Sequence, residues 1–302
     1  MIPICRSLMD DASKKVQIEF IDQLGKIIYS FIPSVPDFLV KAFIKAVPSV
    51  PAGRETFRDT ERDRAYQCAF NFPAVAFALQ KDKWHKISKI YKLLTASQDP
   101  KIRQTLASSV HEIAKIVGRE ITERELVPVF RSYSDDSNIK VQENLFHNMS
   151  EFIYLLSPED RDFCLGYILD HITSELDWKL KLVLISQLIK VCEFIDVSRH
   201  FDKLTTVCMN LCCDGFWQIR KKSIALFPLV FLGLDSSKKH LFIEMIDKLF
   251  HSPRSSHRKT FVLIAFEMKK VLEQDFYFEE KLECLENDPV FDVRLLVKNN
   301  RD

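Results

Sequence analysis

The chain has 302 residues, of which 47% are hydrophobic, and its 43 basic and 42 acidic side chains give a formal charge of +1. This balance argues against a general nucleic-acid or anionic-membrane binder, because either needs an excess of cations. Only 6 residues are Gly, so sheets with tight turns and Gly-rich phosphate-binding loops are unexpected. The 8 Cys include no CxxC pair, which is typical of reduced thiols in a cytoplasmic or nuclear protein.

Membrane insertion is not expected from the hydropathy pattern. The longest apolar stretch, Ser223–Leu234, is too short to span a bilayer and contains Pro228. The N-terminal segment already carries Asp10 and Asp11 and lacks the apolar core of a signal peptide. The sequence therefore predicts neither a membrane nor a nucleic acid as a partner.

Apolar residues recur at helical spacing along most of the chain. Segments 16–28 and 180–195 each show such a stripe, and no alternating run is long enough to compete as a strand. Between them, Gly118 is the expected C-cap of a helix whose stripe comprises Leu106, Ala107, Val110, Ile113, Ala114 and Val117. We expect an all-α fold, interrupted at 47–64, where Pro and charged residues predict an exposed inserted loop.

An internal repeat organises these helices. Polar or cationic residues open successive helices at intervals of 36 to 47 residues: Gln17, Arg64, Arg103, Lys140, Lys181, Arg220, Arg258 and Arg294. An acid or Ser usually precedes each of them in the turn. This pattern predicts helix hairpins of about 38 residues, stacked side by side. In such a stack the acid of one turn lies near the cation of the next.

These turn residues are expected to form a ladder of ion pairs along one edge of the stack. Each exposed pair contributes only about 0.2–1 kcal/mol, so the ladder would fix the register of stacking while apolar burial holds the hairpins together. Some of the acids would also cap the helix that follows. The predicted ladder residues are Asp99, Arg103, Asp136, Lys140, Asp177, Lys181, Asp214 and Asp288.

The turn pattern and its spacing resemble HEAT repeats. The implied fold is one HEAT-repeat α-solenoid over residues 1–302, with about seven to eight repeats and incomplete at both ends. A narrower resemblance is carried by Arg62–Leu79, whose block Tyr66–Val75 reads YQCAFNFPAV, and by Lys101–Phe130. These segments, with looser matches later in the chain, resemble regulatory subunit 1 of protein phosphatase 4.

That resemblance implies a scaffold that binds the catalytic subunit of protein phosphatase 4 and directs it to phosphoprotein substrates. The chain itself would supply no catalytic group, no cofactor and no metal ligand. In related scaffolds the repeat turns hold the catalytic subunit, which implies a partner-binding set here of Trp178, Phe216, Trp217, Arg220 and Arg294. A HEAT-repeat adaptor for transport or trafficking partners is the alternative.

The residues themselves leave several readings open. Trp178, Phe216 and Trp217 either fold back onto their hairpins or anchor a partner. The basic clusters Arg220–Lys222 and Arg254–Lys259 are either a solvated ridge or a stripe that binds phosphate or an acidic partner.

Sequence motifs for catalysis and for metal binding give no positive signal. The chain lacks GxGxxG, P-loop, HExxH and GxSxG motifs, so an enzyme would need a site that no motif reveals. His111 and Glu112 are adjacent on a helix, where their side chains are expected to diverge and not to share a metal. Cys208 and Cys212 are expected to be buried core thiols.

Overall fold

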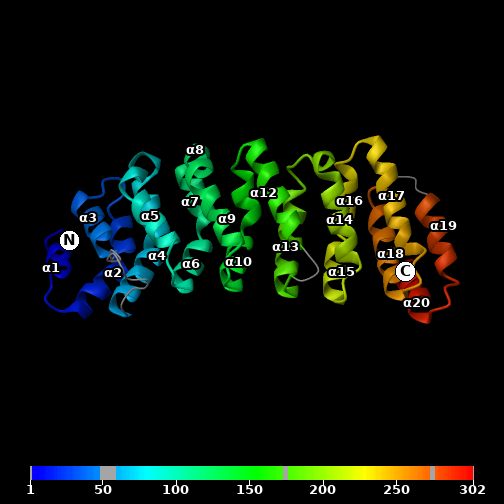
Figure 1. Cartoon of the computed structure of the whole chain (residues 1–302), viewed down its shortest axis with the longest axis horizontal. Helices are drawn as coiled ribbons and strands as arrows, with labels where there is room; N and C mark the ends of the chain where they lie inside the picture. Colours follow the sequence, from blue (N-terminus) through cyan, green and yellow to red (C-terminus); the bar gives the residue numbers. More distant parts are fainter. Residues whose placement is uncertain (1, 48–58, 173–175, 273–275, 302) are drawn as a thin grey trace. The chain divides into compact units, whose positions relative to one another are not determined.

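The computed structural model describes residues 2–47, 59–172, 176–272 and 276–301, and these contain helices and no strand. The predicted all-α fold is therefore confirmed. Their contacts divide the chain into two compact units, Met1–Ser157 and Pro158–Asp302. Figure 1 shows antiparallel helices stacked in chain order within each unit.

Unit 1 is built from helix hairpins. Its helices are α1 Ile2–Met9, α2 Lys14–Tyr29, α3 Asp37–Ala46, α4 Asp59–Leu79, α5 Ser88–Thr95, α6 Pro100–Ala107, α7 Val110–Val117, α8 Arg119–Ile121, α9 Val127–Ser134, α10 Ile139–Phe146 and α11 Met149–Tyr154, with a 3-10 helix at Lys81–Lys86 and a π-turn at Thr122–Leu126. The second helices pack in succession, α2 on α4, α4 on α6 and α6 on α10. The first helices α1, α3, α5 and α9 each pack on the second helix of their own hairpin.

Unit 2 repeats this arrangement. Its helices are α12 Pro158–His171, α13 Trp178–Val191, α14 Phe201–Cys212, α15 Trp217–Ser223, α16 Leu226–Leu232, α17 Ser236–Phe250, α18 Ser255–Lys269, α19 Phe276–Leu285 and α20 Phe291–Arg301, with a 3-10 helix at Val197–His200. One layer contains α12, α14 and α17, and the other contains α13, α15 with α16, α18 and α20.

The sequence placed the helical stripes correctly. The stripe that begins at Leu106 and ends at Val117 is buried to 2% exposure or less in α6 and α7. Gly118 ends α7 with φ +78°, a left-handed conformation that favours Gly, and its N–H donates to the carbonyl of Ala114. Aromatic side chains fill the interior, as where Phe72 contacts Trp84 and Tyr91 in unit 1.

The segment expected as an exposed loop, 47–64, is in part helical. Helix α4 begins at Asp59, so residues 59–64 form its first turns. Residues 48–58 lie outside the described part of the chain. The charged side chains of residues 59–64, which suggested a loop, belong to the first turns of this long helix. No helix in the described residues is long and apolar enough to cross a membrane.

Candidate functional site

The repeat turns share one hydrogen bond. In six turns of the described chain, the residue that opens the second helix donates from its side chain to the backbone carbonyl six residues earlier, with N···O distances of 2.6 to 2.9 Å. The donor and acceptor residues are Gln17–Asp11, Arg103–Ser97, Gln142–Asp136, Arg220–Asp214, Arg258–Ser252 and Arg294–Asp288. The bond closes the turn against the first turn of the helix.

This bond corrects the register that the sequence suggested for one repeat. Gln142, and not Lys140, occupies the opening position, because Asn138 is the N-cap of α10 and accepts from the Lys140 N–H at 3.0 Å. The Nζ of Lys140 bonds Glu143 at 2.7 Å on the same helix. Lys140 is therefore not a ladder residue.

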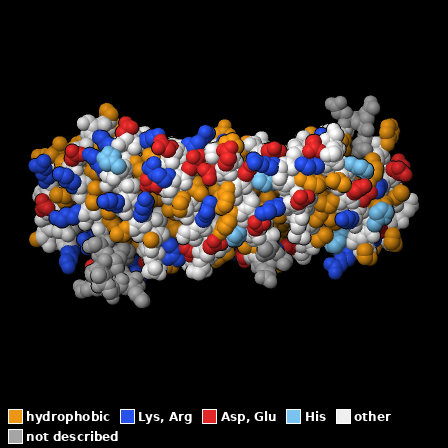
Figure 2. All heavy atoms as spheres, turned by 45° about the horizontal axis from the view of Figure 1, so that its top comes forward, with side chains coloured by type: hydrophobic (Ala, Val, Ile, Leu, Met, Phe, Trp, Pro, Cys, Tyr) orange, Lys and Arg blue, Asp and Glu red, His pale blue; other side chains and the backbone are white. Residues whose placement is uncertain are grey.

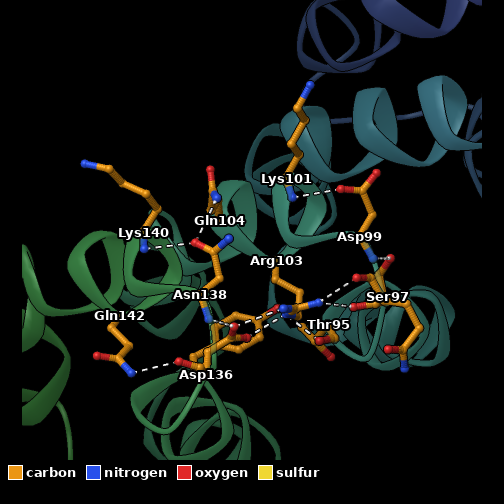
Figure 3. A network of polar contacts seen from close by, with 12 residues as sticks. Thr95, Ser97, Asp99, Lys101, Arg103, Gln104, Asp136, Asn138, Lys140 and Gln142 are labelled. Atoms are coloured by element: carbon orange, nitrogen blue, oxygen red, sulfur yellow. Dashed lines mark hydrogen bonds and ion pairs between the residues drawn. The ribbon is translucent and has the colours of Figure 1, made fainter.

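Arg103 shows how a turn is joined to the next turn of unit 1. Its Nη1 closes its own turn, while Nε and Nη2 donate to the two carboxylate oxygens of Asp136 at 2.6 and 2.9 Å (Figure 3). Asp136 also accepts from the Asn138 N–H at 2.9 Å, so one carboxylate holds its own turn and the preceding cation. Burial has the largest single effect on the pKa of Asp136 and raises it. The hydrogen bonds from Arg103 and the Asn138 N–H, together with the charge of Arg103, outweigh burial, so the pKa is lowered.

In the described residues of unit 2, two contacts of the same kind join neighbouring turns. Lys181 Nζ lies 2.8 Å from Asp214, and Arg258 forms a two-bonded fork with Asp288 at 2.6 and 3.0 Å. The hydrogen bond from Arg258 is the main reason why the pKa of Asp288 is lowered. We call each of these turn-to-turn contacts a rung.

The remaining acids of the predicted ladder have a different role. Asp99 and Asp177 are N-caps, of α6 and α13, and accept backbone N–H bonds at 2.9 Å from Lys101 and Lys179. Asp99 also pairs with Arg62 at 3.0 Å. Asp99 therefore caps α6 and also pairs with a cation of α4, whereas the contacts described for Asp177 are those of a cap.

Trp178 and Phe216 from neighbouring turns of unit 2 lie against each other. Trp178 is the first residue of α13 and is 40% exposed, and Phe216 immediately precedes α15 and is 54% exposed. Their rings stack with centroids 6.1 Å apart. The pair borders an open groove of about 890 Å³ that also contains Lys181 and Asp214. Neither ring is folded into the core, so both remain available at the surface.

The exposed Trp217 and the half-buried Arg220 form a second pair. The guanidinium of Arg220 lies 5.6 Å from the centre of the Trp217 ring, and Trp217 is 39% exposed. Phe291 and Arg294 repeat this geometry at 5.6 Å, with Phe291 63% exposed. Sequence reasoning singled out Arg294 and missed Phe291, although it stands three residues before the opening cation, as do Trp178 and Trp217. We call Trp178, Phe216, Trp217, Arg220, Phe291 and Arg294 the aromatic ridge.

A further groove lies beside the aromatic ridge. It measures about 420 Å³ and is formed by α15, α18 and α20, including Trp217, Arg220 and the 41% exposed Leu295. In unit 1 the corresponding positions hold Lys14, Pro100 and Ile139, so the aromatic ridge is a feature of unit 2 among the described turns. Acidic and basic side chains are interspersed on the face drawn in Figure 2.

Unit 1 offers a different surface that sequence reasoning missed. Tyr66 and Phe70 on α4 are 37% and 61% exposed, and they line a groove of about 930 Å³ with Gln104 and Asn144 of the following repeats. Both aromatics belong to the block Tyr66–Val75 that carries the narrower resemblance. Their spacing of four residues on one helix was the signal available in the sequence.

One acidic cluster differs from expectation. His111 and Glu112 do converge, with Nε2 and Oε1 3.0 Å apart, and Glu151 completes a group whose donor atoms lie within 4.8 Å of one another. Lys115 already binds both carboxylates, at 3.0 and 2.6 Å. Its ammonium group therefore neutralises the acids at the point where a cation would bind.

The cysteines behave as packing residues. Cys208 and Cys212 are buried at 1% and 0% exposure, which confirms the prediction of core thiols. Burial raises the pKa of Cys212 to about 12, so it stays a thiol at neutral pH.

The fold and its joined turns define a class, the HEAT-type helical-repeat solenoids. The solved structure of Kap121p is 11% identical, with a TM-score of 0.58 over 99% of this chain and 33% of that chain. Importin beta is 8% identical, with a TM-score of 0.56 over 99% of this chain and 43% of that chain. Both likenesses concern the fold alone.

Within that class, the sequence points to one family. Residues 68–171 match the model of the protein phosphatase 4 regulatory subunit 1 middle domain. The serine/threonine-protein phosphatase 4 regulatory subunit 1 of Rattus norvegicus is 28% identical over 282 residues, which cover 88% of this chain and 29% of the relative. The chain thus spans less than a third of that relative's length, and the resemblance inferred from its residues is confirmed.

Proposed function

We propose that the chain is a regulatory scaffold of a protein phosphatase 4 type enzyme, which binds the catalytic subunit and directs it to phosphoprotein substrates. The observation that carries the proposal is the aromatic ridge of unit 2. The similarity to regulatory subunit 1 supports the identity of the partner.

The aromatic ridge has the chemistry of a docking surface. A few hot-spot residues contribute most of the binding energy in protein interfaces, and Trp, Tyr and Arg are enriched among them. A guanidinium over an aromatic ring is also attracted to it. Here the aromatic residues stand at the turns that precede Lys181, Arg220 and Arg294, and the turn that precedes Arg258 has Ser255 instead. A partner that follows the turns of a solenoid can contact several of them. Trp178 and Phe216 flank one groove and Trp217 with Arg220 flank another, so rigid anchors lie next to concave surface.

The proposed mechanism is positional. A scaffold that holds both enzyme and substrate raises the effective concentration of one near the other, without contributing to the chemical step. The chain would then be no enzyme itself, and the metals and catalytic groups would belong to the phosphatase. The free cysteines suit the reducing cytoplasm or nucleus as its location.

A binding measurement with purified proteins tests this proposal. The double variant Trp217→Ala and Arg220→Gln removes the ring and the charge of one anchor. Gln is chosen because native Gln17 and Gln142 make the same turn bond with an amide, so the turn is retained. We expect the affinity for the catalytic subunit of protein phosphatase 4 to fall by about 30-fold or more, as for a hot-spot residue worth about 2 kcal/mol.

The control changes a matched aliphatic and cationic pair away from the ridge. Leu241→Ala with Lys248→Glu alters exposed residues of α17 and should leave the affinity within about twofold. Circular dichroism should show equal helix content for both variants. Failure of the wild-type chain to bind the catalytic subunit, or equal binding by the ridge variant, would refute the proposal.

A further inference from the structure

One rung of unit 2 is open. Lys181 reaches Asp214 and Arg258 reaches Asp288, but the acceptor position that follows Arg220 holds Ser252. Ser252 lies 32 positions after Arg220, against 33 and 30 for the two closed rungs. The turn therefore carries a cation that has no acid opposite it.

Ser252 closes its own turn as the acids do, but it makes no rung with the preceding cation. Its Oγ accepts from the Arg254 N–H at 3.3 Å, as the first carboxylate oxygens of Asp214 and Asp288 accept from the N–H two residues later at 2.8 Å. An Asp has a second oxygen that extends to the preceding cation. A Ser lacks it, so the turn forms while the rung does not.

The guanidinium of Arg220 shows the consequence. Its Nη1 donates to the carbonyls of Asp214 and Gly215 at 2.6 and 3.0 Å. Its Nε is buried and has no acceptor, and Nη2 also lacks one among the described residues. In Arg258 the same two groups hold Asp288. A buried donor without a partner is unfavourable, so an oxyanion that supplies acceptors here would relieve that penalty on binding.

The unpaired Nε and Nη2 groups of Arg220, which we call the open fork, have cationic surroundings. Arg254 is exposed, and the neighbouring acids Asp288 and Asp292 are already paired with Arg258 and Lys259. His257 Nδ1 lies 2.9 Å from Ser252 Oγ. Burial lowers the pKa of His257, and the charges of Arg254 and Arg220 lower it further, so the imidazole is neutral at pH 7 and both guanidiniums are near it.

We propose that Arg220, Arg254 and Ser252 form an oxyanion-binding site for the phosphate of a phosphoserine or phosphothreonine side chain in a partner protein. In a closed rung one carboxylate is paired with one cation. Here two guanidiniums lack an acid, and a phosphate monoester brings a charge of about −1.5 to −2 and three acceptor oxygens. The Nε–H and Nη2–H of Arg220 present the two parallel donors that phosphate oxygens accept. The groove beside Trp217 gives the peptide access to Arg220.

Nuclear magnetic resonance of the arginine Nε–H groups tests the site at pH 7. The probe is a short phosphoserine peptide without other acids, compared with its unphosphorylated form, with a Glu form and with inorganic phosphate. We expect the Arg220 Nε–H signal to shift on titration with the phosphopeptide and, more weakly, with inorganic phosphate. The unphosphorylated peptide should cause no shift.

Two variants should abolish the effect by different routes. Ser252→Asp places a carboxylate in the open rung and should reduce phosphopeptide affinity by about tenfold or more, while the melting temperature rises. Arg220→Gln keeps the turn bond but removes the fork, and should reduce affinity similarly. The control Lys248→Glu changes an exposed charge on α17, away from the proposed site, and should change affinity by less than about threefold.

Three results would overturn the proposal. They are absence of a shift at about 10 mM phosphopeptide, equal binding by the Glu peptide, and binding that neither variant weakens. The site does not depend on the phosphatase partner, so loss of capture by the catalytic subunit with retained phosphopeptide binding would refute only the scaffold proposal.

Discussion

At the scale of single residues, the side chain at the opening position of a repeat can close its own turn and can also bind the acid of the next turn. An Arg at this position can do both. Arg103 and Arg258 use one nitrogen to close their own turn and two to hold the next acid. Gln142 has one amide group and closes its turn only. Lys181 has a single ammonium, which reaches Asp214 at 2.8 Å. The choice of side chain thus sets how firmly one hairpin is joined to the next.

Asp288→Asn tests the energy of a closed rung. The change leaves the buried fork of Arg258 without a charged acceptor, and we expect it to lower the free energy of unfolding by about 2 kcal/mol at pH 7. Urea unfolding followed by circular dichroism measures this. Glu143→Gln, which breaks the exposed pair with Lys140, is the control and should cost less than about 0.5 kcal/mol.

Acid should remove the difference between Asp288→Asn and wild type. The pKa of Asp288 is lowered in the folded chain, mainly by Arg258. Its stabilising contribution is therefore complete above the unfolded-state pKa of about 4 and is lost as pH falls from there through the folded-state pKa. The unfolding energies of the two proteins should converge between pH 4 and the acid limit. A difference that is constant with pH would mean that the rung contributes nothing electrostatic.

The sequence predicts the kind of turn contact but not its details. Arg103, Asp136, Lys181, Asp214 and Asp288 were assigned from the repeat alone. Two details that depend on where side chains extend were not predicted. One is the register at Lys140, because an apolar residue precedes both Lys140 and Gln142. The other is the contact between His111 and Glu112. The open rung at Ser252 could not be predicted, because the sequence does not show which donors of Arg220 lack an acceptor.

At the scale of elements, a buried amide joins α2 to α4. Asn71 is 6% exposed, and its Oδ1 accepts from the Gly25 N–H at 3.2 Å. Its Nδ2 donates to carbonyls on both helices, those of Ile21, Asp22 and Gln67 at 2.9 to 3.2 Å. Every bonding group of the amide is used, so this polar contact fixes how the two helices meet without leaving a buried group unpaired.

Gly25→Ala should disrupt this junction. A Cβ at position 25 would lie 2.3 Å from Asn71 Oδ1, so either the amide or the helix must move. We expect a loss of about 1–3 kcal/mol of stability, because overpacking is added to the strained hydrogen bonds. Thermal unfolding measures the loss. Gly215→Ala, whose new methyl meets nothing within 4 Å, is the control and should shift the melting temperature little.

Helix positions were predictable because the apolar spacing of an amphipathic helix lies within a short stretch of sequence, as in α2, α7 and α13. The contact between Asn71 and Gly25 was not, because it joins residues 46 apart through a polar bond that leaves no hydrophobic signature. Within 47–64, the part that proved helical, 59–64, was misassigned because its charged residues resemble a loop before the apolar stripe of α4 begins.

At the scale of the whole molecule, stacked hairpins should confine the effect of a local change. Within each unit, the described repeats pack on their neighbours in chain order, so stability should be close to a sum of nearest-neighbour terms. Hydrogen exchange measured by mass spectrometry reads this directly. We expect Asp136→Asn to increase exchange in α6, α9 and α10, and Asp288→Asn to increase it in α18, α19 and α20, without effect on the other set. The double variant should show the sum of both patterns, since the sites share no partner. Faster exchange throughout the chain after either single change would mean a single cooperative core, and the solenoid account of the stability would be wrong.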